Sequence, residues 1–163
     1  MKRLILLLFI VLVSCNKEQP TTFSEPANLE MLVGVDGTKI TFREVLYKHK
    51  GKKILIDFWA SWCKDCIVGF PKLNQLQKEF PDVEYVFLST DFSQPSWKKG
   101  IKKYKIKGEH YNLPKGMNDG DLVEFINLSW IPTYMVIDEE GEIALFKATN
   151  ITDKAIREAL EDN

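Results

Sequence analysis

The sequence predicts an α/β protein in which one mixed β-sheet is flanked by helices. From Gly51 onward, short apolar runs typical of strands alternate with helical runs, which implies parallel strands joined by right-handed crossovers. Turn dipeptides at Asp36-Gly37 and Glu140-Gly141 add hairpins, whose strands are antiparallel. The 163 residues are about one domain, and their composition of 45% apolar and 28% charged residues is ordinary for a globular protein.

The N-terminus is predicted to be an export signal over residues 1–14. Lys2 and Arg3 precede an apolar run, Leu4 to Val13, that is too short to span a bilayer comfortably. The following Leu12-Val13-Ser14-Cys15 resembles the bacterial lipoprotein box, which implies that Cys15 is lipidated and becomes the first residue. We therefore expect a lipidated tether over residues 15–27, anchored to a membrane of the bacterial cell envelope and facing the periplasm or outer surface. The alternative is an ordinary cleaved signal peptide and a free periplasmic protein.

The folded domain is expected over residues 28–163 and begins with a small hairpin. Its strands are predicted at Glu30–Val35 and Lys39–Phe42. Thr41 then caps a short helix that ends near Lys48, with Glu44 completing a capping box.

The middle of the domain carries the alternating pattern. Recurring apolar residues at three- and four-residue steps give the first long helix a stripe that faces the core. The predicted elements are a strand at Lys53–Trp59, a helix at Cys63–Phe80, a strand at Val83–Ser89 and a helix at Ser93–Tyr104.

The last third is predicted to contain shorter elements. Tyr111 to Leu128 includes Gly116 and Gly120 and is interpreted as a mobile insertion near the substrate groove. The predicted elements are a strand at Gly108–Leu113, a helix at Asp121–Asn127, a hairpin of Thr133–Ile137 and Glu142–Ala148, and a closing helix at Asp153–Leu160 capped by Thr152.

Cys63 and Cys66 form the most informative motif, because an apolar strand ends in a Trp-rich turn just before them. A sulfur at the start of a helix faces unpaired N–H groups and the positive end of the helix dipole, which stabilise a thiolate. A second cysteine three positions later lies on the same face, near enough to close a disulfide. The pair therefore predicts a redox site in which one thiol attacks a partner disulfide and the other resolves the mixed intermediate. If Cys15 takes lipid, no cysteine of the three is left over.

The run Ile54-Leu55-Ile56-Asp57-Phe58-Trp59-Ala60-Ser61-Trp62-Cys63-Lys64-Asp65-Cys66, then Pro71 and Ile131-Pro132-Thr133, resembles the thioredoxin superfamily over about residues 30–162. The exported N-terminus, the extra hairpin and the central insertion resemble its TlpA/ResA branch of membrane-tethered thiol-disulfide oxidoreductases. The resemblance implies a thioredoxin-like fold with a central mixed sheet of four or five strands.

The resemblance also implies roles for three residues. Cys63 matches the exposed nucleophile, Cys66 the resolving thiol, and Pro132 the cis-proline opposite the disulfide. A cis bond after Ile131 turns the preceding backbone toward the cysteines, where an extended partner segment can pair with it. The alternative for Pro132 is a trans proline that starts a strand.

Asp57 is a candidate acid, because it lies in the apolar strand before the cysteines. A buried carboxylate is costly unless it is paired or protonated, and an acid with a raised pKa can take the proton of Cys66. The resemblance points to the same role. The alternatives are an exposed carboxylate at a strand edge or an ion pair with a lysine such as Lys53.

Other residues give weaker indications. Trp62 is expected to contact partner chains and Trp59 to pack in the core. His49 and His110 are interpreted as structural or surface residues, and no metal or other cofactor is expected. Most members of the branch carry an acidic residue three positions after the second cysteine, and this chain has Gly69 there, which argues against a specific role in cytochrome c maturation. A run of six lysines on and after the second long helix is a solvated face, or faces an anionic membrane or an acidic partner: Lys98, Lys99, Lys102, Lys103, Lys105 and Lys107.

The sequence as a whole predicts a thiol-disulfide oxidoreductase, a reductant or exchanger, that acts on disulfide- or thiol-bearing exported proteins and needs a separate redox partner. The formal charge of −1 gives no support to nucleic-acid binding. The alternative function is a non-catalytic, thioredoxin-like binding lipoprotein with a structural Cys63–Cys66 disulfide. A thiol peroxidase is a weaker alternative, because the chain lacks the Thr-X-X-Cys pattern of peroxiredoxins.

Overall fold

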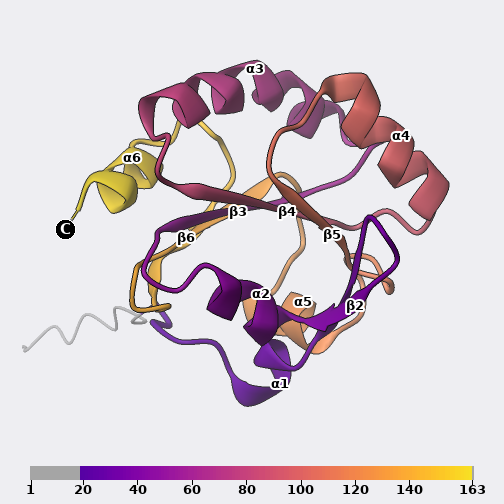
Figure 1. Cartoon of the computed structure of the whole chain (residues 1–163), viewed down its shortest axis with the longest axis horizontal. Helices are drawn as coiled ribbons and strands as arrows, with labels where there is room; N and C mark the ends of the chain where they lie inside the picture. Colours follow the sequence, from indigo (N-terminus) through magenta and orange to yellow (C-terminus); the bar gives the residue numbers. More distant parts are fainter. Residues whose placement is uncertain (1–18, 163) are drawn as a thin grey trace, which may run out of the picture.

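A computed structural model of the chain describes residues 19–162, which form a sheet between two groups of helices (Figure 1). The predicted signal peptide, residues 1–14, and Cys15 lie outside the described residues. One face of the sheet is covered by α3 (Lys64–Glu79), α4 (Gln94–Tyr104) and α6 (Lys154–Glu161), and the other by α1 (Glu25–Asn28), α2 (Phe42–Lys48) and α5 (Asp121–Ile126).

The described residues form one mixed sheet, which confirms the predicted fold class. Its strands are β1 (Met31–Gly34), β2 (Lys39–Thr41), β3 (Ile54–Trp59), β4 (Glu84–Ser89), β5 (Glu109–Asn112), β6 (Thr133–Ile137) and β7 (Ile143–Ala148), in the order β2-β1-β5-β4-β3-β6-β7. Strands β3, β4 and β5 are parallel, and the other pairs are antiparallel. The predicted N-terminal hairpin, β1 and β2, joins the predicted central sheet of five strands through the pairing of β1 with β5, so the described sheet has seven strands.

The central strand β3 positions the site. All six of its residues are buried, and it pairs with β4 on one side and β6 on the other. The C-terminal ends of the parallel strands β3, β4 and β5 meet at one edge of the sheet, where the antiparallel β6 begins. In open α/β sheets this edge is where functional loops gather.

The domain begins earlier than residue 28, so the predicted tether over 15–27 is too long. Phe23 is almost fully buried and packs edge-on against Phe42, with ring centroids 4.8 Å apart. The Ser24 hydroxyl accepts from the Ala27 N–H and caps α1, and the Ile143 N–H donates to the Thr21 carbonyl at 2.6 Å. Phe23 is the one aromatic residue of the predicted tether. Because its ring packs in the core, the chain from Thr21 onward lies against the domain.

The segment Tyr111–Leu128 is also packed into the domain, in contrast to the mobile insertion expected from its glycines. Leu122 and Ile126 on α5 are fully buried, and Phe125 packs against Phe23. The burial of these apolar side chains of α5 therefore holds the segment against the domain, although the loop before it is rich in glycine.

The predicted helix starts are correct in one case and wrong in another. At α2, the Thr41 side chain and Glu44 form the predicted capping box, with a 2.8 Å bond from the Thr41 N–H to the carboxylate. At α6, the N-cap is Asp153 instead of Thr152, because the Asp153 carboxylate accepts from the Ala155 N–H at 3.0 Å. The Thr152 hydroxyl donates instead to Asn150.

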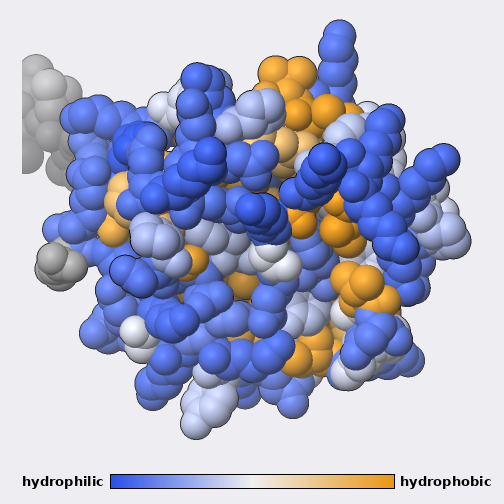
Figure 2. Space-filling view, turned by 45° about the horizontal axis from the view of Figure 1, so that its top comes forward, coloured by the Kyte–Doolittle hydropathy of each residue, from blue (hydrophilic) through white to orange (hydrophobic). Residues whose placement is uncertain are grey.

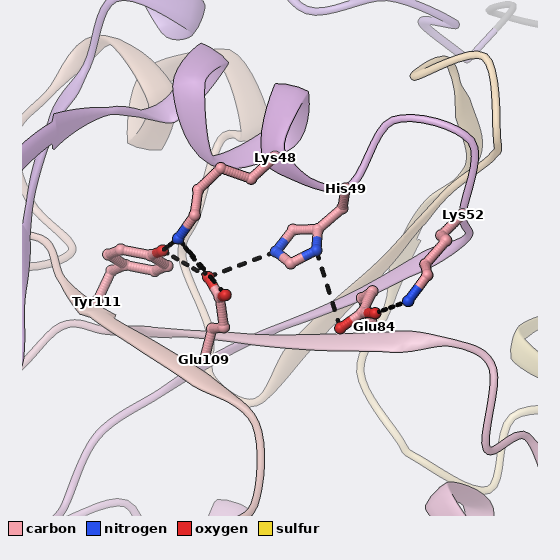
Figure 3. A network of polar contacts seen from close by, with 6 residues as sticks. All are labelled: Lys48, His49, Lys52, Glu84, Glu109 and Tyr111. Atoms are coloured by element: carbon pink, nitrogen blue, oxygen red, sulfur yellow. Dashed lines mark hydrogen bonds and ion pairs between the residues drawn. The ribbon is translucent and has the colours of Figure 1, made fainter.

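A polar network ties the end of α2 to the starts of β4 and β5 (Figure 3). The two ring nitrogens of His49 lie 3.8 Å from a Glu84 oxygen and 3.4 Å from a Glu109 oxygen. Burial alone raises the pKa of Glu109, but hydrogen bonds from Tyr111 and Lys48 outweigh it and lower that pKa. Because Glu84 and Glu109 begin their strands, this network lies at the sheet edge opposite the cysteines and has a structural role.

Candidate functional site

A disulfide joins Cys63 and Cys66 at the start of α3. The S–S distance is 2.03 Å and the two Cα atoms lie 5.3 Å apart. Cys63 is the N-cap of the helix, and its Sγ accepts from the Cys66 N–H at 3.1 Å. The Cys63 sulfur therefore lies at the positive end of the helix dipole, where a thiolate is stabilised.

Both sulfurs are nearly enclosed in the disulfide form. Cys63 is 5% exposed and Cys66 is 1% exposed. Cys63 is expected to be exposed, but its exposed fraction is only slightly larger than that of Cys66.

The Ile131–Pro132 peptide bond is cis and lies against the disulfide. The Ile131 carbonyl oxygen is 3.6 Å from the Cys63 Sγ. The Thr133 hydroxyl donates to the Trp130 carbonyl at 2.8 Å, which orders the chain just before β6. The antiparallel pairing of β6 with β3 thus brings a segment from far along the chain to the cysteines.

Asp57 lies within the sheet directly before the Cys-containing turn and is 1% exposed. Neither of its carboxylate oxygens has a hydrogen-bond partner among residues 19–162. Desolvation by burial raises the pKa of Asp57 well above its ordinary value. An exposed strand-edge position is excluded, and so is pairing with Lys53, whose Nζ instead donates to backbone carbonyls at the end of α6.

Asp57 faces the helix α3 side of the sheet, because side chains alternate along a strand and Trp59, two residues later, contacts Phe70 of that helix. Its cross-strand neighbour on β6 is Tyr134. Burial and the nearby Asp57 charge both raise the pKa of Tyr134. A Cβ at position 69 would lie 3.3 Å from the Tyr134 hydroxyl. Gly69, which stands where most members of the branch carry an acidic residue, therefore leaves room for this tyrosine.

Asp91 is a site residue that the sequence analysis missed. It follows β4, is 2% exposed, and its carboxylate accepts from the Ser61 N–H at 2.8 Å and the Ser61 hydroxyl at 2.7 Å. Ser61 is two residues before Cys63. The signal that could have found this contact is an acidic residue directly after a buried strand that is parallel to the strand before the cysteines.

Two exposed tryptophans are sequence neighbours of the site residues. Trp62, next to Cys63, is 61% exposed, and Trp130, next to Ile131, is 58% exposed. Trp59 is fully buried in the core. Figure 2 shows separate hydrophobic patches on an otherwise largely hydrophilic face on the side of α3 and α4. No sequence pattern singles out Trp130, since a single tryptophan in a loop has no periodic neighbours.

His110, the second histidine of the described residues, packs against the core. His110 stacks on Phe87 with centroids 4.9 Å apart, and burial lowers the pKa of this histidine. Within residues 19–162, no group of three or more His, Cys, Asp or Glu side chains is placed to hold a metal ion. In the same part of the chain, no helix is both long and apolar enough to cross a bilayer.

Comparisons with known proteins agree with this geometry. Residues 51–143 match the family model described as thioredoxin-like. The chain is 31% identical over 123 residues to the thioredoxin-like protein YneN of Bacillus subtilis, covering 71% of this chain and 68% of the relative. It is 26% identical over 130 residues to the thiol-disulfide oxidoreductase ResA of Bacillus cereus, covering 78% of this chain and 70% of the relative.

A solved structure shows the same arrangement. The crystal structure of a putative thiol-disulfide oxidoreductase from Bacteroides vulgatus superposes with a TM-score of 0.69 and 27% identity. The superposition covers 90% of this chain and 98% of that one.

Proposed function

This chain belongs to the thioredoxin-like family and is a thiol-disulfide oxidoreductase of the TlpA/ResA-like type, and from that premise we propose that it exchanges disulfides with exported proteins, Cys63 attacking and Cys66 resolving. The observation that carries the assignment of roles is the different setting of the two sulfurs. Cys63 caps the helix and has the larger exposure, whereas Cys66 is 1% exposed.

The exchange takes two steps. In the first, the Cys63 thiolate attacks one sulfur of a client disulfide, the client S–S bond breaks, and the other client sulfur leaves as a thiolate that takes up a proton. In the second, Cys66 loses its proton and attacks the Cys63 sulfur. The Cys63–Cys66 disulfide forms, and the client leaves as a dithiol, reduced by two electrons. The same steps in reverse oxidise a client dithiol.

Asp57 supports the second step as a general base. Burial raises its pKa, so its ionised carboxylate binds a proton more tightly than an ordinary aspartate does and can take the proton that Cys66 loses; its carboxylate oxygens have no competing donor in the described part of the chain. The cis peptide at Pro132 supports client docking, because the Ile131 carbonyl beside the Cys63 sulfur can accept from an extended client backbone. Trp62 provides an exposed apolar surface next to the nucleophile.

Mixed-disulfide trapping tests these roles. A reduced Cys66→Ser protein should accumulate covalent complexes with a disulfide-bonded client such as insulin, because the second step is blocked. The matched Cys63→Ser protein, with the same single sulfur-to-oxygen change three residues away, should form none and should not reduce insulin. Normal insulin reduction by Cys63→Ser would overturn the assignment, and a pair that never exchanges would favour a structural bridge.

We also propose that the protein is exported and held in the bacterial cell envelope by lipid on Cys15. The support is the charged start, the short apolar run and the lipoprotein-box resemblance of the sequence. Cys15→Ser should release the protein from the membrane fraction and remove metabolically incorporated fatty acid. Membrane attachment that persists unchanged in this variant would contradict the anchor.

A further inference from the structure

The buried carboxylate of Asp91 receives three hydrogen bonds near the cysteines. Ser61 provides two of them, from its N–H at 2.8 Å and its hydroxyl at 2.7 Å, and the Ser89 hydroxyl provides the third at 2.8 Å. Three donors on two oxygens suit a carboxylate, which only accepts. Asp91 is thus bound to the turn that precedes Cys63, although the two residues are far apart in the sequence.

Asp91 itself is held from the two neighbouring strands. Its N–H donates to the Ser89 hydroxyl at 3.0 Å. The Asn112 side chain, at the end of β5, donates to the Asp91 carbonyl at 2.8 Å and to the Ser89 carbonyl at 3.1 Å. The carboxylate is therefore a rigid support tied to the ends of β4 and β5.

Ser61 is enclosed from the other side by helix α4. A Cβ at Gly100 would lie 2.8 Å from the Ser61 Cβ, so only a glycine allows this approach without displacement. The turn is closed by the Cys63 N–H, which donates to the Ala60 carbonyl at 3.1 Å. The residues that lead to Cys63 are thus fixed on both sides, whereas Trp62 stays exposed.

We propose that Asp91 is a positioning residue for thiol-disulfide exchange, holding the Ser61–Cys63 turn so that the Cys63 sulfur stays at the start of α3 and beside the Ile131 carbonyl. In the disulfide form the bond to Cys66 already fixes Cys63. Once that bond opens, the position of the Cys63 sulfur depends on the Ser61–Cys63 turn and on the hydrogen bonds between Ser61 and Asp91. The inference rests on the proposed role of Cys63 as nucleophile.

Asp91 acts on the Cys63 thiolate in two opposite ways. Its hydrogen bonds to Ser61 keep the sulfur at the helix N-terminus, which favours the thiolate, while its negative charge disfavours it. The other titratable side chains near the pair in the described chain are Lys64 and Asp65, both exposed on α3, and Asp57, buried on β3. A test must therefore separate hydrogen bonding from charge.

Two variants make that separation. Asp91→Asn and Asp91→Ala both remove the charge, but only asparagine keeps an oxygen that accepts from the Ser61 N–H. At neutral pH, alkylation of reduced Cys63 by iodoacetamide should be about fivefold slower in Asp91→Ala than in Asp91→Asn, the factor of one buried hydrogen bond. Mass spectrometry of the Cys63 peptide in the full-length chain measures the rate, and its pH profile should shift to higher pH in the alanine variant.

Asp36→Ala is the matched control. The Asp36 carboxylate accepts the same pair of bonds, from the Thr38 N–H at 2.9 Å and the Thr38 hydroxyl at 2.7 Å, but in the hairpin at the sheet edge. Its loss should leave the Cys63 alkylation rate unchanged. An equal slowing in this control would overturn the proposal, because the effect would then reflect general loosening of the fold.

Equal alkylation rates in folded Asp91→Ala and Asp91→Asn would also overturn it. If Asp91→Ala does not fold, Ser61→Ala removes the hydroxyl bond alone and should slow alkylation about twofold, and an unchanged rate there counts against the proposal. A failure of positioning is distinct from a failure of the proposed function, because Cys66→Ser would still trap clients in the first case and would trap none in the second.

Discussion

The free energy of unfolding of Asp57→Asn should increasingly exceed that of wild type as the pH rises, because only the wild type loses stability through this residue. Asp57 is 1% exposed, and neither carboxylate oxygen has a partner within residues 19–162, so ionising it in the folded state is costly. Desolvation by burial accordingly raises its pKa well above the ordinary value. Asparagine has nearly the same shape and cannot ionise, so it isolates this one proton.

The sign follows from where the proton is bound. Below about pH 4 both the folded and the unfolded states keep Asp57 protonated, and its contribution to stability is fully present. Above that pH the unfolded state loses the proton while the folded state retains it, so wild-type stability falls until the pH passes the raised folded-state pKa. One proton changes the free energy of unfolding by about 1.4 kcal/mol per pH unit over this interval.

Urea unfolding of the oxidised proteins at about pH 5, 6 and 7 measures this slope, since the disulfide removes both thiols from the titration. The difference between Asp57→Asn and wild type should grow with pH, by at most about 1.4 kcal/mol for each pH unit, and should level off once the pH passes the raised folded-state pKa of Asp57. Asp36→Asn is the control: hydrogen bonds from Thr38 lower the pKa of Asp36, so its contribution is lost only as the pH falls through that lowered pKa, and its difference should stay flat over this range. A flat difference for Asp57→Asn would refute the buried, protonated acid.

Three further outcomes are expected. Gly100→Ala should lower the free energy of unfolding by about 1–3 kcal/mol in urea, because its Cβ would lie 2.8 Å from Ser61, and unchanged stability would show that α4 moves away freely. Thr41→Ala should cost about 1 kcal/mol by the same measurement, because the α2 capping box is lost, and a cost near zero would mean that water replaces it. Trp130→Ala should raise KM for insulin but leave reduction of a small disulfide reagent unchanged; an equal loss for both would place Trp130 in the chemistry instead of in client docking.

Much of the fold could be predicted because the relevant forces are local. The apolar stripe of α3 repeats with the period of a helix, and β3 is a short run that is apolar except for Asp57, as is typical of a buried strand. The Thr41 capping box needs only neighbours three residues apart. The four-residue α1 escaped prediction because it is too short to show a period. The pairing of β1 with β5, which widens the sheet, joins segments nearly eighty residues apart and has no local signature.

The candidate site likewise contains residues that a local sequence pattern indicates and one that it does not. The Cys-X-X-Cys spacing at a strand-to-helix turn indicated the redox pair, and the resemblance of Ile131-Pro132-Thr133 supplied the proline. Asp91 gave no comparable signal, since an acidic residue after a strand is common in loops. Its contact with Ser61 exists because β3 and β4 are parallel neighbours whose ends meet at one edge.

The sequence by itself determined where the longer helices and most strands form and that two sulfurs lie at the first turn of a helix, since backbone geometry over a few residues settles both. Tertiary structure alone decided that Cys63, Ile131 and Asp91 meet at one sheet edge and that Asp57 is enclosed without a partner in the described chain. The reason is that strand order and desolvation depend on how the whole core packs, and no short stretch of sequence contains that information.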